Sequence, residues 1–232
     1  VKTGTIFENT KLPLRKWFMA IWLVLSHKKG ISSLLLSKDI KVTQKTAWFM
    51  LQRIRECLMC KNEGRLENEV EADETFVGGK NKNRHKDKKV KKRQGRSFKD
   101  KPPVLGMVGR KGEVVTRVIK STSRSEITPI IQQFVDKRAV LYTDEWGGYD
   151  EIDKSYYHYT VDHGKGQYVN GRIYTNTIEG FWTGLKRGYI GIYHYMSPKH
   201  LQRYANEFTF RYNTRKVSDF HKFNLLLCNI KY

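Results

Sequence analysis

The stretch 69–79, EVEADETFVGG, alternates acidic or polar residues with apolar ones before it ends at two glycines. A period of two predicts a β-strand, with Glu71 and Asp73 on one face and Val70 and Ala72 on the other. Because the apolar face can enter a core, Asp73 is expected near the end of a buried strand. This strand begins the part of the chain that we expect to form a sheet.

The chain beyond this strand continues with strands and helices. β-rich runs are expected at 104–108, 114–119, 138–143 and 156–161, and helices at 125–135, after Asn176 and after Ser197. Glycines at positions 109 and 112 predict a hairpin between the second and third strands. This order of elements predicts an α/β fold with a mixed sheet.

Residues 11–60 carry a helical pattern instead, and three helices are expected there. In the first of them, Trp17, Ile21 and Leu25 recur at helical spacing. Thr43 is suited to cap the third helix. The apolar face of that third helix is expected to consist of Trp48, Leu51, Ile54 and Leu58. A short helix, a tight turn and a longer helix with a polar face are typical of the helix-turn-helix motif.

The polar face of the third helix is a candidate DNA contact. The residues off its apolar stripe that could reach bases or phosphates are Gln44, Lys45, Gln52 and Arg53. A plain three-helix packing unit explains the same pattern without DNA, so both interpretations stay open.

The charge of the chain narrows the class of partner. Lys and Arg number 44 against 23 Asp and Glu, which gives a net charge of +21 and predicts a polyanionic partner. The longest strongly apolar run, 17–25, is too short to cross a bilayer, for which about 20 residues are needed. Three cysteines are too few for a disulfide framework, and we expect a reducing, cytoplasmic setting.

A basic run occupies 80–101, directly after the strand that carries Asp73. Its densest cluster of cations consists of Lys88, Lys89, Lys91, Lys92 and Arg93. Charge runs of this kind are usually solvated loops. The position of the run suggests a second interpretation, an arm that follows DNA phosphates beside a site at Asp73.

Three carboxylates lie at the ends of predicted core elements. Besides Asp73, Asp144 comes as the apolar strand 138–143 runs out, where α/β sheets bind ligands. Glu179 and Lys186 lie on one line of the predicted helix after Asn176, beside its buried stripe. Three acids brought to one point can hold divalent cations for phosphoryl transfer, and the lysine can hold DNA.

Each of these carboxylates also has a structural explanation. Glu179 lies three residues after Asn176, the spacing of a capping box. Asp144 could cap the turn at Gly147 and Gly148. Other acids that could take the catalytic places are Glu71, Glu74, Glu145 and Glu207.

The segments around the three acids closely resemble the DDE transposases of ISXO-type bacterial insertion sequences, which are relatives of the Merlin elements. The matching segments are VEADETFVGGK, LYTDEWGGY and NTIEGFWTGLKRGYIGIYHYMSPKHLQRYANEFTFRYNTR. The similarity extends to the front of the chain, in TGTIFENTKLPLRKWF and KTAWFMLQRIRE. It therefore covers almost the whole chain, and the three motifs together are highly specific.

This resemblance implies an RNase H-like catalytic domain, as in retroviral integrases. Asp73, Asp144 and Glu179 fall on the catalytic acids of the family and would hold two Mg²⁺ ions, for which Mn²⁺ can substitute. Lys186 falls on the lysine that follows the third acid, and Arg187 beside it is a further DNA contact. Relatives usually begin with a zinc ribbon, which we expect to be missing here because the chain starts just after its place.

The predicted organisation has two parts. Residues 1–64 form a helix-turn-helix-like DNA-binding region, and residues 65–232 form the catalytic domain with a basic insertion at 80–101. The resemblance implies DNA as partner, both the terminal inverted repeats and the target, with a homodimer or larger assembly on it. The expected reaction is strand cleavage at the transposon ends and transfer of the 3′-OH into target DNA.

Two other functions fit the same residues. One is a catalytically silent DNA-binding protein derived from a transposase, which the expected loss of the zinc ribbon favours and the intact acids oppose. The other is a structure-selective RNase H-like nuclease, which would cut branched DNA without joining strands.

Overall fold

The computed structural model describes residues 2–59, 64–79, 85–89, 101–110, 112–149, 152, 156–161 and 174–230. It divides into two compact units. One is built from 1–61 and 187–232, and we call it the helical unit. The other, 62–186, is called the sheet unit.

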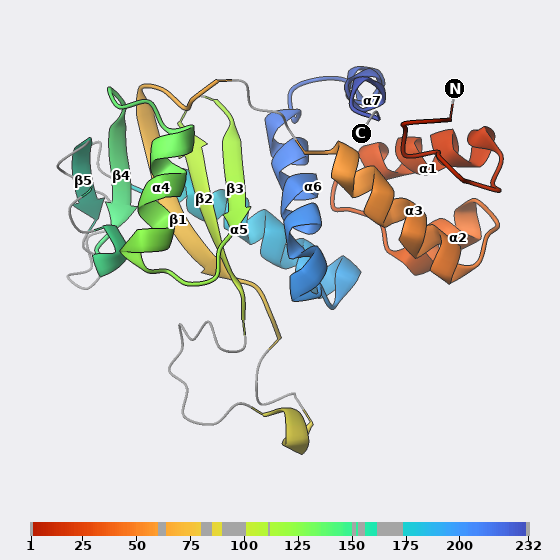
Figure 1. The fold of residues 1–232 in the computed structure, drawn as a ribbon, viewed down its shortest axis with the longest axis horizontal. Helices are drawn as coiled ribbons and strands as arrows, with labels where there is room; N and C mark the ends of the chain where they lie inside the picture. The colour runs from red at the N-terminus through yellow and green to blue at the C-terminus, as the bar shows by residue number, and fades with distance from the viewer. Residues whose placement is uncertain are drawn as a thin grey trace. The chain divides into compact units, whose positions relative to one another are not determined.

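The sheet unit contains one mixed sheet of five strands. In chain order these are β1 (Glu69–Phe76), β2 (Pro103–Gly109), β3 (Val114–Val118), β4 (Val140–Asp144) and β5 (Tyr157–Val161). In space the order is β3-β2-β1-β4-β5 (Figure 1). β1 pairs antiparallel with β2 and parallel with β4, while β4 pairs parallel with β5. Three antiparallel strands followed by two parallel ones in this order form the RNase H-like arrangement, so the predicted fold class is confirmed.

Two helices cover opposite faces of this sheet, α4 (Arg124–Phe134) and α5 (Asn176–Gly188) (Figure 1). The face with Val70 and Ala72 packs on α4, where Ile127 and Ile131 are fully buried in the same core. The opposite face, with Glu71 and Asp73, meets α5. The alternation along β1 therefore decides which helix meets the carboxylates.

The helical unit brings together the two ends of the chain. Its helices are α1 (Leu14–Ser26), α2 (Ser33–Asp39), α3 (Gln44–Cys57), α6 (Leu201–Asn213) and α7 (Asp219–Cys228). Trp17 of α1 and Ile54 of α3 share one core with Phe210 of α6 and Leu226 of α7. The three N-terminal helices occur where the sequence predicts them, and α7 is an additional helix. No helix among the described residues has both the length and the apolar surface to cross a membrane.

Two details of α3 correct the sequence-based prediction. Trp48 is 42% exposed rather than part of the apolar face. Gln52, expected on the DNA-facing surface, is 3% exposed, and its Nε2 donates a hydrogen bond to the Tyr204 hydroxyl on α6 at 3.3 Å. The partner that buries Gln52 comes from a distant part of the chain, which local periodicity does not reveal.

Candidate active site

β1 and β4 place two acids at the same level of the sheet. Their parallel register pairs Glu69 with Val140 and Glu71 with Tyr142, a constant offset of 71 residues. Asp73 and Asp144 are separated by the same 71 positions (144 − 73). Because both strands run in the same direction, this offset places the two residues side by side, with Asp144 the last residue of β4 and Asp73 three residues before the end of β1.

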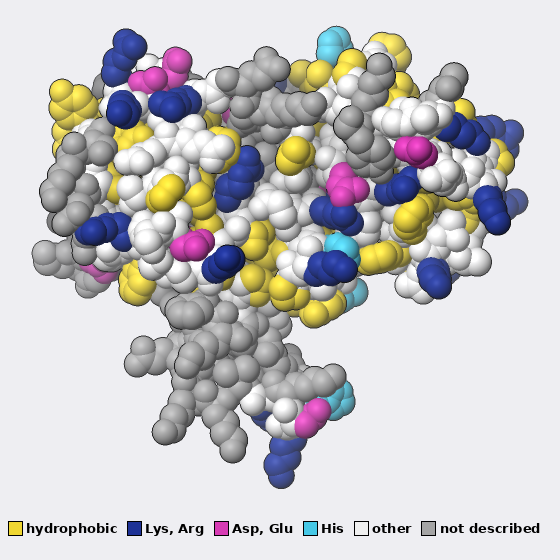
Figure 2. Space-filling view, in the orientation of Figure 1, with side chains coloured by type: hydrophobic (Ala, Val, Ile, Leu, Met, Phe, Trp, Pro, Cys, Tyr) yellow, Lys and Arg dark blue, Asp and Glu magenta, His cyan; other side chains and the backbone are white. Residues whose placement is uncertain are grey.

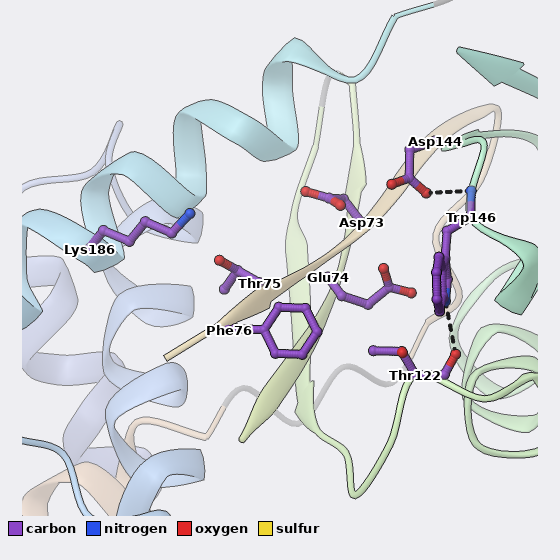
Figure 3. Close-up of a pocket in the computed structure, with 8 residues that line it drawn as sticks. All are labelled: Asp73, Glu74, Thr75, Phe76, Thr122, Asp144, Trp146 and Lys186. Atoms are coloured by element: carbon purple, nitrogen blue, oxygen red, sulfur yellow. Dashed lines mark hydrogen bonds between the residues drawn. The ribbon is translucent and has the colours of Figure 1, made fainter. Parts of the chain in front are cut away.

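The two acids line one open pocket in the sheet unit, with a volume of about 230 Å³. Its lining consists of Asp73, Glu74, Thr75, Phe76, Thr122, Asp144, Trp146 and Lys186. In Figure 3 the Lys186 side chain extends from α5 toward Asp73. The pocket therefore joins two acids and one cation of the predicted site.

Asp73 is held by a hydrogen bond from α5. The indole Nε1–H of Trp182 donates to Asp73 Oδ2 at 3.0 Å. Burial raises the pKa of Asp73 to about 6, and the negative charge of Asp144 adds to this rise. The Trp182 hydrogen bond acts in the opposite direction, and Glu179 adds the smallest upward effect. The site thus concentrates negative charge, which favours a bound cation.

Asp144 has a structural contact as well as its place in the pocket. Its Oδ1 accepts a hydrogen bond from the backbone N–H of Trp146 at 3.2 Å. The Trp146 indole in turn donates to the Thr122 carbonyl at 3.0 Å (Figure 3). The turn-capping explanation for Asp144 and its place beside Asp73 are therefore both realised in the structure.

Glu179 lies outside this pocket. Its side chain is exposed on α5, and the Thr175 hydroxyl approaches its Oε1 at 3.5 Å. Among the described residues, no three His, Cys, Asp or Glu side chains meet where they could hold one metal ion. The structure thus brings together Asp73, Asp144 and Lys186, while Glu179 is near enough to act on Asp73 only through its charge.

Two of the rival acids are engaged elsewhere. Glu71 is fully buried on β1 and accepts hydrogen bonds from the start of α5. Glu207 belongs to the helical unit, where Arg55 and Arg211 donate to it at 2.7 and 2.6 Å. Glu74 does line the pocket, whereas Glu145 is exposed and not part of its lining.

The predicted DNA contacts differ in their exposure. Gln44 and Lys45 are exposed at the start of α3. Arg53 is partly buried, and its Nη1 donates to the Ile6 and Glu8 carbonyls at 2.7 and 3.0 Å.

The remaining predicted contacts are Arg187 and the cations of the basic run. Arg187 and Lys89 are exposed, and Lys88 lies in the short 3₁₀ turn Lys86–Lys88. The positions outside the described residues are Lys91, Lys92 and Arg93. Figure 2 shows Lys and Arg side chains spread over the face in view.

Sequence reasoning missed two residues that contact acids of β1, Trp182 and Arg110. Arg110 donates to Glu71 and Glu69 at 2.9 and 3.2 Å. Trp182 was expected only as part of a buried stripe, yet its indole reaches Asp73. Its position three residues after Glu179 was the available signal, because residues so spaced share a helix face.

The fold and the two neighbouring acids define an RNase H-like protein with a carboxylate site on adjacent parallel strands. Residues 65–213 match the ISXO2-like transposase domain. The chain therefore belongs to the ISXO2-like transposase family.

Two curated proteins share this similarity. An uncharacterized protein in transposable element ISH50 of Halobacterium salinarum is 30% identical over 219 residues, which cover 90% of this chain and 73% of that protein. An uncharacterized transposase-like protein of Haemophilus influenzae is 27% identical over 108 residues, 46% of this chain and 86% of that protein.

Solved structures show a weaker likeness. The Mos1 strand transfer complex aligns with a TM-score of 0.36 and 13% identity, over 97% of this chain and 81% of that one. The Mos1 mariner paired end complex with Mn aligns with a TM-score of 0.34 and 12% identity, over 97% and 82%. The fold assignment rests on the strand order, since likeness at this level adds no weight.

Proposed function

We propose that this chain cuts DNA at transposon ends and joins the freed 3′-OH to target DNA, with Asp73, Asp144 and Glu179 as its catalytic acids. The observation that carries this proposal is the placement of Asp73 and Asp144 on adjacent parallel strands, in one open pocket with Lys186. Membership of a transposase family supports the reaction class.

The donor set suits a hard divalent cation. Carboxylate oxygens are the ligands that Mg²⁺ prefers. The negative charge of Asp144 helps raise the pKa of Asp73, and a bound cation would remove that repulsion. We therefore propose that Asp73, Asp144 and Glu179 hold two Mg²⁺ ions, or Mn²⁺ in their place. When bound, such ions activate the attacking hydroxyl and stabilise the departing oxygen.

The protein's own residues would supply position and charge. Trp182 fixes the Asp73 carboxylate through its indole N–H. Lys186 would hold a phosphate near the scissile bond, because its ammonium lines the same pocket. Glu179 would join the two aspartates by turning its exposed side chain toward Asp73. In-line displacement at phosphorus needs little else from the protein.

The DNA path would extend beyond the pocket. We propose residues 1–64 as the DNA-binding region, with Gln44, Lys45 and Arg53 as contacts, and 65–232 as the catalytic domain. The basic insertion 80–101 and Arg187 would add phosphate contacts. Two transposon ends processed together call for a homodimer or larger assembly on DNA, acting in the bacterial cytoplasm.

The experiment is a cleavage assay on duplex DNA that carries the sequences flanking the gene, with a supercoiled plasmid as target. With Mg²⁺ or Mn²⁺ we expect new 3′-OH ends and plasmid-joined products, both abolished by EDTA. DNA binding without any metal-dependent cleavage would support the silent DNA-binding protein instead. Cleavage of branched DNA without joined products would support a structure-selective nuclease.

A further inference from the structure

Glu71 takes no part in the chemistry proposed above, yet it is a fully buried carboxylate two residues before Asp73 on the same face of β1. We propose that Glu71 is a positioning residue that fixes the start of α5 on the sheet and thereby sets where Glu179 stands relative to Asp73. The inference rests on the proposed function, because Glu179 matters only as a ligand of that site.

The contacts of Glu71 with α5 replace the usual cap of a helix. Its Oε2 accepts the backbone N–H groups of Thr177 and Ile178 at 2.9 and 3.1 Å. Its Oε1 accepts the Thr177 hydroxyl at 2.9 Å. The first N–H groups of a helix have no partner within it, and a negative charge is favoured there. The cap of α5 therefore comes from strand β1 rather than from the residues before the helix.

Arg110 ties the same carboxylate to Tyr174, two residues before this helix. Its Nε donates to Glu71 Oε1 at 2.9 Å, and its Nη2 donates to the Tyr174 carbonyl at 2.9 Å. The guanidinium carbon also lies 3.9 and 3.8 Å from the ring centroids of Tyr142 and Tyr174. A planar cation that contacts two aromatic rings and donates to three acceptors, the third being Glu69 Oε1 at 3.2 Å, is held rigidly.

A second contact holds α5 farther along its length. Trp182 donates to Asp73, and its ring lies over Gly106, the residue of β2 that pairs with Asp73. A Cβ at Gly106 would stand only 2.5 Å from the Trp182 ring. Glu179 therefore lies on the segment of α5 between a contact at 177–178 and a contact at 182. Helix position and helix rotation are both fixed on this segment.

The same contacts exclude Glu71 as a substitute ligand. A carboxylate offers about four lone-pair sites. Hydrogen bonds from Arg110, Thr177 and Ile178 account for two on each oxygen. Glu71 cannot bind a cation without releasing α5, so its role is to place Glu179 and not to replace it.

The test is a double-mutant cycle on the full chain, with Mn²⁺ binding measured by electron paramagnetic resonance of the free ion. We expect Glu71→Gln to weaken Mn²⁺ binding about 10–100-fold, the range typical of residues that orient metal ligands. In a Glu179→Gln background, Glu71→Gln should weaken Mn²⁺ binding less than about twofold, because Glu71 acts through Glu179. An equal loss in both backgrounds would overturn the proposal.

A second measurement needs no metal. Amide hydrogen exchange at Thr177 and Ile178 should speed up at least about tenfold in Glu71→Gln, because their acceptor is altered. Unchanged exchange at both amides would overturn the proposal. If Glu179→Gln alone leaves Mn²⁺ binding unchanged, the proposed ligand set fails, while the exchange experiment still decides whether Glu71 holds α5.

Matched variants separate this role from a general loss of stability. Tyr156→Phe removes one buried hydrogen bond of the sheet unit, to the Val135 carbonyl at 3.2 Å, without touching α5. It should leave Mn²⁺ binding and amide hydrogen exchange in α5 unchanged. Effects as large as those of Glu71→Gln in this variant would overturn the proposal. Should Glu71→Gln not fold, Thr177→Val removes only the hydroxyl contact and should weaken Mn²⁺ binding severalfold. No change in Thr177→Val would count against the proposal.

Discussion

At Asp73, burial and the charge of Asp144 disfavour the ionised carboxylate, which is the form that binds a metal ion. Burial and the neighbouring Asp144 raise its pKa to about 6, so the free site carries a carboxylate that is easily protonated. A divalent cation reverses this balance by stabilising the ionised form. The same reasoning explains why Trp182 contacts Asp73, since an N–H donor also favours the ionised carboxylate.

The residue-scale prediction follows from this charge. Asp73→Asn keeps the shape of the side chain but removes the negative oxygen, so metal-dependent cleavage should fall by about 10³-fold or more. DNA affinity, measured by a gel-shift titration, should change less than about twofold. Glu113→Gln, an exposed acid of the same unit, is the control and should leave cleavage unchanged. Full cleavage by Asp73→Asn would contradict the assignment.

Gly106 gives a second prediction at this scale. Gly106→Ala would place a methyl group 2.5 Å from the Trp182 ring in a packed layer, and should cost about 1–3 kcal/mol of unfolding free energy. Gly109→Ala in the same strand meets nothing closer than 3.9 Å and is the matched control. Urea unfolding of the two variants measures the difference, and equal stability would show that Trp182 is not closely seated on β2.

At the scale of elements, the beginning of α3 and its later turns differ in how their side chains are bound. Its start is capped as predicted, with the Thr46 N–H donating to the Thr43 hydroxyl at 3.2 Å. Lys45 near this start is exposed, whereas Arg53 is held by two backbone carbonyls. α3 thus carries an exposed cation at its beginning and, farther along, a cation that also binds the backbone.

The element-scale prediction uses this difference. Lys45→Ala should lower DNA affinity and reduce the slope of log K against log salt by about 0.9, with stability unchanged. Lys137→Ala, in the exposed turn before β4, is the control and should leave the slope as it is. Arg53→Ala should also lower the unfolding temperature, because two carbonyls lose their donor. An unchanged salt slope in Lys45→Ala would remove α3 from the DNA path.

The sequence was most informative where structure is local. The period-two pattern of β1, the apolar stripe of α5 and the Thr43 cap each depend on neighbours in the chain, and each was predicted correctly. The cap of α5 could not be predicted, because Glu71 reaches Thr177 from 106 positions away. For the start of this helix the sequence indicated only a local cap, a capping box from Asn176 to Glu179. Tertiary partners decide such contacts.

At the scale of the whole molecule, one buried ionic cluster joins distant parts of the helical unit. Glu207 on α6 binds Arg55 on α3, while Arg211 binds both Glu207 and the Val24 carbonyl at the end of α1. Burial alone would raise the pKa of Glu207, but the two guanidinium groups outweigh it and hold the pKa at about 2. The stability of this unit is therefore linked to pH.

The sign of the pH effect follows from a lowered pKa. The stabilisation is complete above pH 4.5, the ordinary pKa of a glutamate, and is lost as the pH falls from 4.5 toward 2. Urea unfolding between pH 7 and 3 should show this loss in the wild type. Glu207→Gln should be less stable by about 3–5 kcal/mol at pH 7, because it leaves two buried cations unpaired. It should also lose less stability below pH 4.5, and parallel pH profiles would contradict this role of Glu207.

The central claim, that Asp73, Asp144 and Glu179 form one metal site, is tested most directly by a crystal structure of the protein soaked in Mn²⁺. Anomalous scattering locates manganese independently of the surrounding protein. We predict manganese peaks within coordinating distance of Asp73 and Asp144, with the Glu179 side chain turned toward them. Ordered aspartates without manganese, or manganese bound by Glu74 in place of Glu179, would contradict the claim.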